Sequence, residues 1–399
     1  MVDADWWEEP RHVIGHRNER RYGAFTFLCL VVFLTLFGLT MLYSSSYDEA
    51  VRHNLPHYYF FLRQCAFVAL AFLVSLVIFF MPLRYLERLT WPFLLGSLVL
   101  MLLTLFSPLG STTLGARRWI RLGPMSLQSS EVVKIASIFF ISSWHSKEHR
   151  KGICHLVPLG VMLGFAALIL LQRDFSTTIV YLCLCLSLEM AAGLHIGILL
   201  LCFGCISVPG ILAILTEPYR IQRMASFLFP GLDRSGASYQ VESAMKAMRS
   251  GGLFGVGIGR GTYKLGLIPE VQNDFIFASM CEELGLFWML FLLALFFLFA
   301  FLGYRSFALM VRHDRFLGFL DFGLTTMIVS QAAINVAVVI GLLPPTGIPL
   351  PFFSQGGTNL FVTLLSCALL LRIMVELGKM PGESTPDSER IVQFPVDRT

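Results

Sequence analysis

Asp274 is the acidic residue of "QNDFIF" (272–277), where a polar stretch gives way to an apolar one. The sequence that follows carries almost no charge as far as Tyr304, apart from Glu282 and Glu283. An aspartate at this point has two interpretations. It can cap a helix or stabilise its first turn, because Asp favours helix N-termini. It can also serve as a general base on a cavity that carries cations as well.

Two charged residues, Glu131 and Lys134, lie at the start of an apolar stretch in "SSEVVKIASIFF" (129–140). Two residues three apart share one face of a helix and can form an ion pair. Charge inside a membrane segment is costly and usually functional, so we favour a functional pair over a purely structural one. Upstream, Arg118 precedes Trp119; interface anchoring explains the tryptophan well.

The composition shows what kind of scaffold must position these residues. Of the 399 residues, 56% are hydrophobic and 14% are charged, whereas a soluble domain carries roughly 25% charged residues. The chain is therefore an integral membrane protein. Its first apolar run (24–43) is uncharged and long enough to span a bilayer, and it exceeds the usual core of a cleaved signal peptide. The net charge of +4 is too small to indicate a nucleic-acid partner.

Apolar runs bounded by charge predict an all-α polytopic membrane protein with about ten transmembrane helices. A barrel would need alternating strands, and that pattern is absent from the apolar runs. The predicted spans are 24–44, 60–80, 92–108, 130–145, 156–172, 176–192, 194–215, 275–303, 318–342 and 352–375.

The distribution of basic residues predicts the orientation. It places both termini in the cytoplasm, with tails at 1–23 and 379–399 around a ten-span domain at 24–378. Two outer segments, 109–129 and 216–274, contradict the rule because they too are rich in Lys and Arg. Either the orientation is inverted, or these cations bind an anionic ligand outside the membrane.

Two further segments have unusual composition. "SGGLFGVGIGRGTYKLG" (250–266) lacks the G-K-[ST] ending of a phosphate-binding loop, so we predict non-helical backbone that lines a cavity. "GLLPPTGIPLPFFSQGG" (341–357) has four prolines between apolar flanks, which predicts a re-entrant or interfacial loop on the outer side. "CFGC" (202–205) has no histidine beside it, so we predict apolar packing residues there and no metal ligands.

Together these motifs resemble the SEDS family (shape, elongation, division and sporulation), which includes FtsW, RodA and SpoVE. The matching segments follow the family's order and spacing over most of the chain: "YSSS", "FFLRQ", "GARRWIRLGP", "SSEVVKIA", "DFSTTIV", "YRIQRMASFLFP", "SYQVESAMKAMRSGGLFGVGIG", "PEVQNDFIF", "EELG" and "LLPPTGIPLPFFSQGG". The polar N-terminus and "YYFFLRQ" look more like FtsW, the division member, whereas "TGIPLPF" looks more like RodA, the elongation member. We favour FtsW.

The resemblance implies a function and a set of site residues. The family polymerises lipid II, an undecaprenyl-diphosphate-linked disaccharide pentapeptide, outside the cytoplasmic membrane, alongside a class B penicillin-binding protein and other division or elongation proteins. The family's essential acid corresponds to Asp274, its important Glu and Lys to Glu131 and Lys134, and its Arg before Trp to Arg118. A role for these proteins as lipid II flippases has also been proposed.

Several positions depart from the family pattern without removing a carboxylate or a cation. Ser129 replaces a usual Pro, Glu242 a common Gln, and Gln355 a Tyr, while Thr358 and Asn359 replace a pair of serines. "VQND" replaces the commoner "AHTD". These changes affect the predicted shape of the last outer loop and any assignment to a subfamily that relies on that loop.

The expected reaction is attack of a sugar 4-hydroxyl on an anomeric carbon that carries a diphosphate leaving group, with inversion. Asp274 would remove the hydroxyl proton, and Glu131 would orient Lys134. The cationic candidates for stabilising the diphosphate are Arg118, Lys134, Arg220 and Arg223. A divalent cation, Mg²⁺ or Mn²⁺, could share that charge, although the sequence has no dedicated ligand cluster for it. Transporters tend to place charge at the bilayer midplane, so charge in outer loops and helix ends favours the transferase over the flippase.

Overall fold

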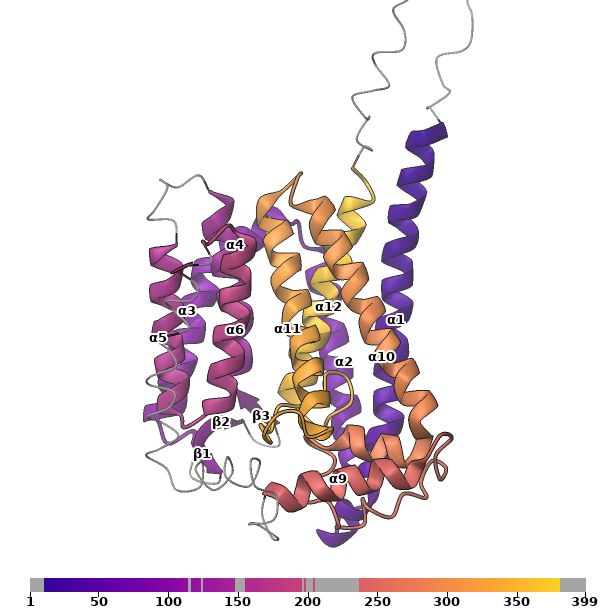
Figure 1. Cartoon of the computed structure of the whole chain (residues 1–399). Coiled ribbons are helices and arrows are strands. Elements are labelled where there is room, and N and C mark those ends of the chain that lie inside the picture. Colours follow the sequence, from indigo (N-terminus) through magenta and orange to yellow (C-terminus); the bar gives the residue numbers. More distant parts are fainter. Residues whose placement is uncertain are drawn as a thin grey trace, which may run out of the picture.

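A computed structural model describes residues 11–113, 116–122, 125–147, 155–195, 197–198, 204 and 237–380. Its helices form an upright bundle, and the termini of the described chain lie at one end of it (Figure 1). The helices are α1 (Arg11–Arg52), α2 (Tyr59–Phe80), α3 (Arg84–Phe106), α4 (Ser129–Ser146), α5 (Leu156–Leu171), α6 (Phe175–Ala191), α9 (Ala237–Gly251), α10 (Ile276–Met310), α11 (Arg315–Val339) and α12 (Gly357–Leu377).

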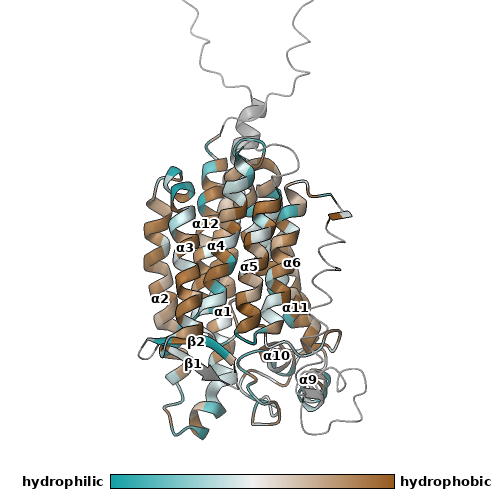
Figure 2. Ribbon diagram, turned by 90° about the vertical axis from the view of Figure 1, so that its left-hand side faces the viewer, coloured by the Kyte–Doolittle hydropathy of each residue, from teal (hydrophilic) through white to brown (hydrophobic). Residues whose placement is uncertain are grey.

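Six of the described helices are long and apolar enough to cross a bilayer: α1 from Tyr22 onward, α2, α3, α10, α11 and α12. α5 and α6 are apolar but shorter. Hydrophobic residues cover the bundle along its length, and hydrophilic residues gather towards its two ends (Figure 2). With α4, these helices coincide with nine of the predicted spans. The remaining span, 194–215, lies almost entirely outside the described residues, so the total of ten stays a prediction.

Helix boundaries differ from the prediction where charge does not mark a helix end. α1 is continuous from Arg11, so it passes through the boundary predicted at residue 23. α3 begins at Arg84 rather than at residue 92, because its first turns are charged and Pro92 is accommodated inside the helix. α12 begins at Gly357 rather than at residue 352.

α4 occupies the centre of the bundle. Nearly all its residues are buried, and it packs against α3, α5, α6, α11 and α12. A helix surrounded by other helices can carry polar residues that never meet lipid. Its first turn, which includes Glu131, is therefore enclosed by protein.

The prediction of an entirely helical fold is wrong for the segment before α4. Residues there form a three-stranded antiparallel sheet of β1 (Gly110–Thr113), β2 (Ala116–Leu122) and β3 (Met125–Gln128). In β2, Ala116 and Ile120 are buried while Arg117 and Arg121 are exposed, the alternation expected of a strand with one face on the core. The sheet lies at the end of the bundle away from the termini (Figure 1).

The glycine-rich segment fills a break in α10. Gly285 interrupts that helix with a φ of 82°. The amides of Val256 and Gly257 donate to the carbonyl oxygens of Glu282 and Glu283 at 3.0 and 2.9 Å. On the other side of the break, the Leu286 and Phe287 amides donate to Gly252 and Leu253 at 3.0 and 3.1 Å. Beyond Gly251 the segment is non-helical, as predicted, and these backbone contacts join it to the break in α10.

The proline-rich segment between α11 and α12 is non-helical, as predicted, and protein encloses its centre. Leu350, Phe352 and Phe353 are buried. Gly38 of α1 packs against this backbone so closely that a Cβ atom at that position would overlap the carbonyl oxygen of Phe352. The Gln64 side chain of α2 donates to the Ser354 carbonyl at 3.2 Å. Neighbouring helices thus satisfy part of this irregular backbone, as membrane depth requires.

Candidate active site

α10 begins at the end of the bundle that carries the sheet and α9 (Figure 1), and Asp274 lies two residues before its first residue. The capping position of α10 is Phe275, and no side-chain hydrogen bond caps this helix among the described residues. Asp274 is therefore not the capping residue of α10; it lies two residues before the first residue of the helix. The residue is half-buried, which leaves its carboxylate within reach of a ligand.

Asn335 of α11 fixes the backbone on which Asp274 sits. Its side-chain amide donates to the Asp274 carbonyl oxygen and to the Ile348 carbonyl oxygen, each at 2.8 Å. It thereby joins the segment before α10 to the proline-rich loop. The amide oxygen of Asn335 is buried and has no hydrogen-bond partner among the described residues. A buried acceptor without a partner is costly.

The proline-rich loop meets Asp274 at two further points. The Gln355 amide donates to the Gln272 carbonyl oxygen at 2.8 Å. A Cβ atom at Gly347, where φ is +73°, would lie 3.8 Å from Oδ2 of Asp274. The proline-rich loop, predicted to be re-entrant or interfacial, therefore lies beside Asp274.

Glu131 and Lys134 form the ion pair that their spacing predicts. Nζ of Lys134 lies 2.7 Å from Oε1 of Glu131, and the two side chains are only 2% and 5% exposed. Asn359 of α12 lies beside this pair. Its amide nitrogen is 3.4 Å from Oε2 of Glu131 and 3.5 Å from the amide oxygen of Gln331.

Together with the spacing of two residues on α11, these contacts define a polar row through the bundle: Asn335, Gln331, Asn359, Glu131 and Lys134. Gln331 and Asn335 are four residues apart on α11 and therefore lie on one face of it. All five residues are buried. The row begins at the backbone of Asp274 and ends at Lys134, so residues from three helices join the two predicted parts of the site.

Arg118 lies on β2 and contacts the start of α6. Its Nε is 3.5 Å from Oδ2 of Asp174, and it donates to the Arg173 carbonyl oxygen at 2.9 Å. Asp174 in turn accepts from the Thr177 amide at 3.3 Å and caps α6. The Arg118 side chain is 37% exposed, so one side of it remains accessible to a ligand.

Positions that depart from the family pattern make specific contacts here. Ser129 accepts from the Gln172 side chain at 3.0 Å, a bond that a proline could not make. The Thr358 hydroxyl donates to the Ser126 carbonyl oxygen at 2.7 Å and so ties α12 to β3. Glu242 pairs with Lys246 on an exposed face of α9 at 2.7 Å, where an ion pair contributes little stability.

Sequence reasoning missed a second buried ionic cluster. Lys264 pairs with Glu283 inside the break of α10, and its Nζ also donates to the Ser44 hydroxyl at 2.8 Å. Glu282 accepts from the backbone amide and hydroxyl of Thr262 at 2.6 and 3.0 Å. Charged residues next to each other in an apolar run were the available signal. The spacing of Gln331 and Asn335 within one span was a second such signal.

Two hollows lie near these elements. A polar one of about 180 Å³ is lined by Glu49, Arg52, Lys264, Glu270 and Gln272, among others. Partial burial and the nearby Glu49 raise the pKa of the Glu270 carboxyl, while His53 opposes that shift. Asp274 does not line this hollow, but Gln272 connects the two.

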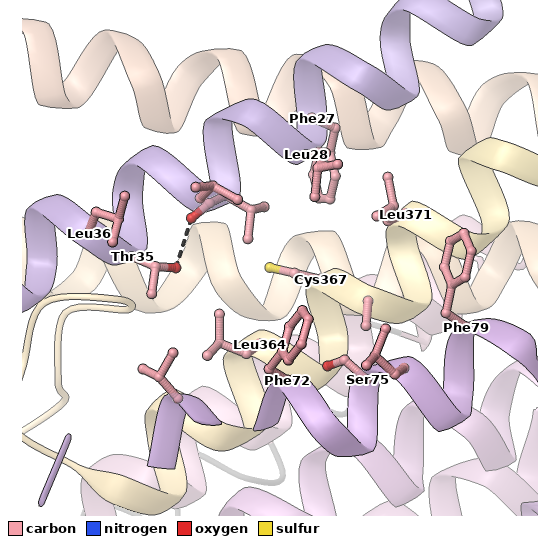
Figure 3. A pocket seen from close by; sticks show the side chains of 15 residues that line it. Phe27, Leu28, Thr35, Leu36, Phe72, Ser75, Phe79, Leu364, Cys367 and Leu371 are labelled. Carbon is pink, nitrogen blue, oxygen red and sulfur yellow. Dashed lines mark hydrogen bonds between the residues drawn. The ribbon is translucent and has the colours of Figure 1, made fainter. Parts of the chain in front are cut away.

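The larger hollow, of about 420 Å³, lies between α1, α2 and α12 (Figure 3). Its lining is apolar apart from Thr35, Ser75 and Cys367, and the Thr35 hydroxyl donates a hydrogen bond to the Val31 carbonyl oxygen at 2.7 Å. Such a surface suits a hydrocarbon chain and offers no group for proton transfer. We therefore exclude it from the reacting site.

Of the predicted site residues, the structure joins Asp274, Glu131 and Lys134 through the polar row and sets Arg118 on the sheet beside α6. Arg220 and Arg223 lie outside the described residues. In the described part of the chain, the single group of three His, Cys, Asp or Glu side chains with metal-ligand geometry lies elsewhere, on α4, α6 and the residue before α5. The arrangement offers a half-buried carboxylate on a backbone held by Asn335, with a buried Lys–Glu pair on the same row of polar residues.

Comparison with known sequences identifies the family. A profile described as "Cell cycle protein", which covers FtsW, RodA and SpoVE, matches residues 25–379. The probable peptidoglycan glycosyltransferase FtsW of Borreliella burgdorferi is 36% identical over 360 residues, which cover 88% of this chain and 96% of the relative. The protein of the same name from Legionella pneumophila is 31% identical over 350 residues, which cover 85% and 88% of the two chains.

Solved structures share the fold. A chain from a peptidoglycan synthase complex, studied for its structural coordination of polymerization and crosslinking, matches with a TM-score of 0.71 at 25% identity. The match covers 88% of this chain and 97% of that one. The rod shape determining protein RodA of Thermus thermophilus matches with a TM-score of 0.63 at 24% identity, over 88% and 96% of the two chains. Because the profile match extends over most of the chain and the relatives align along nearly their whole length, this chain belongs to the cell cycle protein family of FtsW, RodA and SpoVE.

Proposed function

We propose that this chain is an FtsW-like peptidoglycan glycosyltransferase that polymerises lipid II for septal synthesis during cell division. The observation that carries the proposal is the attachment of Asp274, through Asn335 and the polar row, to the buried Glu131–Lys134 pair. The names of the relatives, probable peptidoglycan glycosyltransferases, agree with this reaction.

Asp274 acts as the general base. A base must lie within hydrogen-bond reach of the acceptor hydroxyl, so its position must be fixed relative to the substrate. The two carbonyl contacts of Asn335 supply that rigidity at 2.8 Å each. Asp274 is half-buried and its Oδ2 lies close to Gly347 of the proline-rich loop, so the base would act beside that loop.

Cations stabilise the diphosphate as it leaves. Lys134 and Arg118 are candidates, each with a carboxylate partner in the structure, Glu131 and Asp174. A diphosphate would bind cations that are already paired with the carboxylates of Glu131 and Asp174. Arg220 and Arg223 remain candidates on the strength of their charge and loop position alone.

The active site faces outward from the bacterial inner membrane, and both termini are cytoplasmic. The sheet, α9 and the start of α10, which Asp274 precedes, lie together at one end of the bundle, and the ends of the described chain lie at the other (Figure 1). A class B penicillin-binding protein is the proposed partner, in agreement with the likeness to a chain of a peptidoglycan synthase complex. A divalent cation that shares the diphosphate charge also remains a proposal.

Purified lipid II gives the direct test. The isolated protein, with and without its penicillin-binding partner, is mixed with lipid II in detergent, and the glycan products are separated by length. We expect strands of several disaccharide units, more of them when the partner is present. A protein that forms no strands in either case, yet moves lipid II across vesicle membranes, would establish the flippase instead. Parallel reactions with EDTA test the divalent cation.

A further inference from the structure

Three side chains with metal-binding donors converge at the end of the bundle opposite Asp274. His145 lies in the last turn of α4, His155 precedes the first residue of α5, and Glu189 lies in the last turn of α6. Nε2 of His145 is 2.9 Å from Oε1 of Glu189, and Nδ1 of His155 is 2.6 Å from Oε2. The ligand atoms of these residues, which we call the His–Glu–His cluster, all lie within 4.8 Å of one another.

The burial of Glu189 creates a need for positive charge. The residue is only 1% exposed, and its ion-pair partners in the described part of the chain are the two imidazoles. A buried carboxylate is stable only when it is paired with a cation or bound to a metal. Its position in the last turn of α6 adds to this need, because the C-terminal end of a helix repels negative charge.

The donors themselves indicate which ion would bind. Two neutral imidazoles and one carboxylate form the protein ligand set of many zinc sites, which leave a fourth position for water. Imidazole donors favour Zn²⁺ and Co²⁺ over Mg²⁺, which prefers oxygen. In tetrahedral zinc sites the donors lie about 3.3 Å apart, so shifts of about 1 Å would bring these three into range.

We propose that His145, His155 and Glu189 bind one divalent transition-metal ion, with Zn²⁺ favoured over Mg²⁺. The ion ties together the adjacent ends of α4, α5 and α6. Its site is separate from the proposed glycosyltransferase site, because Glu131 and Lys134 lie at the opposite end of α4. The inference therefore stands or fails independently of the proposed function.

The test uses the full chain, purified through a tag without histidine and stripped with chelator. Co²⁺ and Zn²⁺ are titrated separately, bound metal is counted by mass spectrometry, and the Co²⁺ complex is followed by visible absorption. We expect about one equivalent per chain at micromolar metal and a rise in the melting temperature of about 2 °C or more at saturating Zn²⁺. Equal Mg²⁺ should give neither effect.

Matched variants distinguish metal binding at this site from binding by cysteine thiols or by other histidines. Glu189→Gln and His155→Gln should lose the tetrahedral Co²⁺ spectrum and the equivalent of bound Zn²⁺. His155 is the milder position, since 16% of its side chain is exposed, and it serves if Glu189→Gln does not fold. His53→Gln is the control, because His53 pairs with Glu49 at 2.9 Å without belonging to a group of three donors.

Two results would overturn the proposal. One is the absence of stoichiometric Co²⁺ or Zn²⁺ binding by the wild-type chain. The other is equal binding by the wild type and His155→Gln. In either case hydrogen bonds between the two histidines and Glu189, without a metal ion, would account for the His–Glu–His cluster.

Discussion

Replacing Lys134 with methionine separates a catalytic cation from a structural one. The substitution removes the charge with little change in length. In the structure Nζ lies 2.7 Å from Glu131, and both side chains are nearly inaccessible to solvent. After the change, the Asn359 amide at 3.4 Å is the side-chain donor that Glu131 keeps among the described residues. Lys134→Met therefore leaves a buried carboxylate without its cation.

Two magnitudes follow from this geometry. Breaking a buried ion pair on one side costs roughly 3–5 kcal/mol of stability, because the remaining charge is uncompensated. Losing one preorganised charge that stabilises a leaving group lowers the rate by roughly 100- to 1,000-fold. The double change Glu131→Gln with Lys134→Met removes both charges and should recover most of the lost stability, but it cannot restore the missing cation.

Melting temperature and lipid II polymerisation are measured on the wild type, both single variants and the double variant. We expect Lys134→Met to be less stable and inactive, and the double variant to be more stable than Lys134→Met but still inactive. An active double variant would refute the catalytic role of Lys134. The diphosphate would then have to be bound by Arg118, Arg220 and Arg223.

Three further predictions test other parts of the structure. Asn335→Ala removes the amide that donates to the carbonyl oxygens of Asp274 and Ile348 and lets Asp274 shift, so turnover should fall roughly 10-fold or more. Asn273→Ala, next to Asp274 and more exposed than Asn335, should stay near wild type. Gly285→Ala should prevent folding, because its Cβ atom would overlap the Gly255 amide. Gly259→Ala, at the same φ of +82° but in open space, should cost only about 1–2 kcal/mol of stability. Expression level and melting temperature compare the two variants, and equal stability would contradict the structural role of the break. A cysteine at Lys246, which is 56% exposed on α9, should react with an impermeant thiol reagent in spheroplasts beyond the wild-type level, and labelling only after permeabilisation would invert the orientation.

The sequence predicts most of the helical bundle because apolar runs bounded by charge report burial directly. α2 and α5 begin within one residue of their predicted starts, 60 and 156. The same rule fails at α3, where Arg84 and Glu87 stand inside the helix. It also fails before α4, where "ARRWIRL" is predicted as part of a loop although the exposed Arg117 and Arg121 each follow a buried residue of a strand.

The candidate site is predictable only in part, because distant contacts leave no local pattern. The spacing of Glu131 and Lys134 predicts their pairing. Nothing in the sequence around Asn359 indicates that it contacts Glu131, which is far from it along the chain. The composition of the glycine-rich segment likewise predicts a non-helical backbone. It does not indicate that this backbone packs against a break at Gly285, inside the apolar run of α10.

Asp274→Asn tests the central claim most directly. The amide keeps the size of the side chain but cannot accept the acceptor hydroxyl's proton, so polymerisation of purified lipid II should fall by roughly 100- to 10,000-fold. Expression, melting temperature and binding of the penicillin-binding partner should remain at wild-type levels. Strand formation at a near-normal rate by this variant would contradict the assignment of Asp274 as the base.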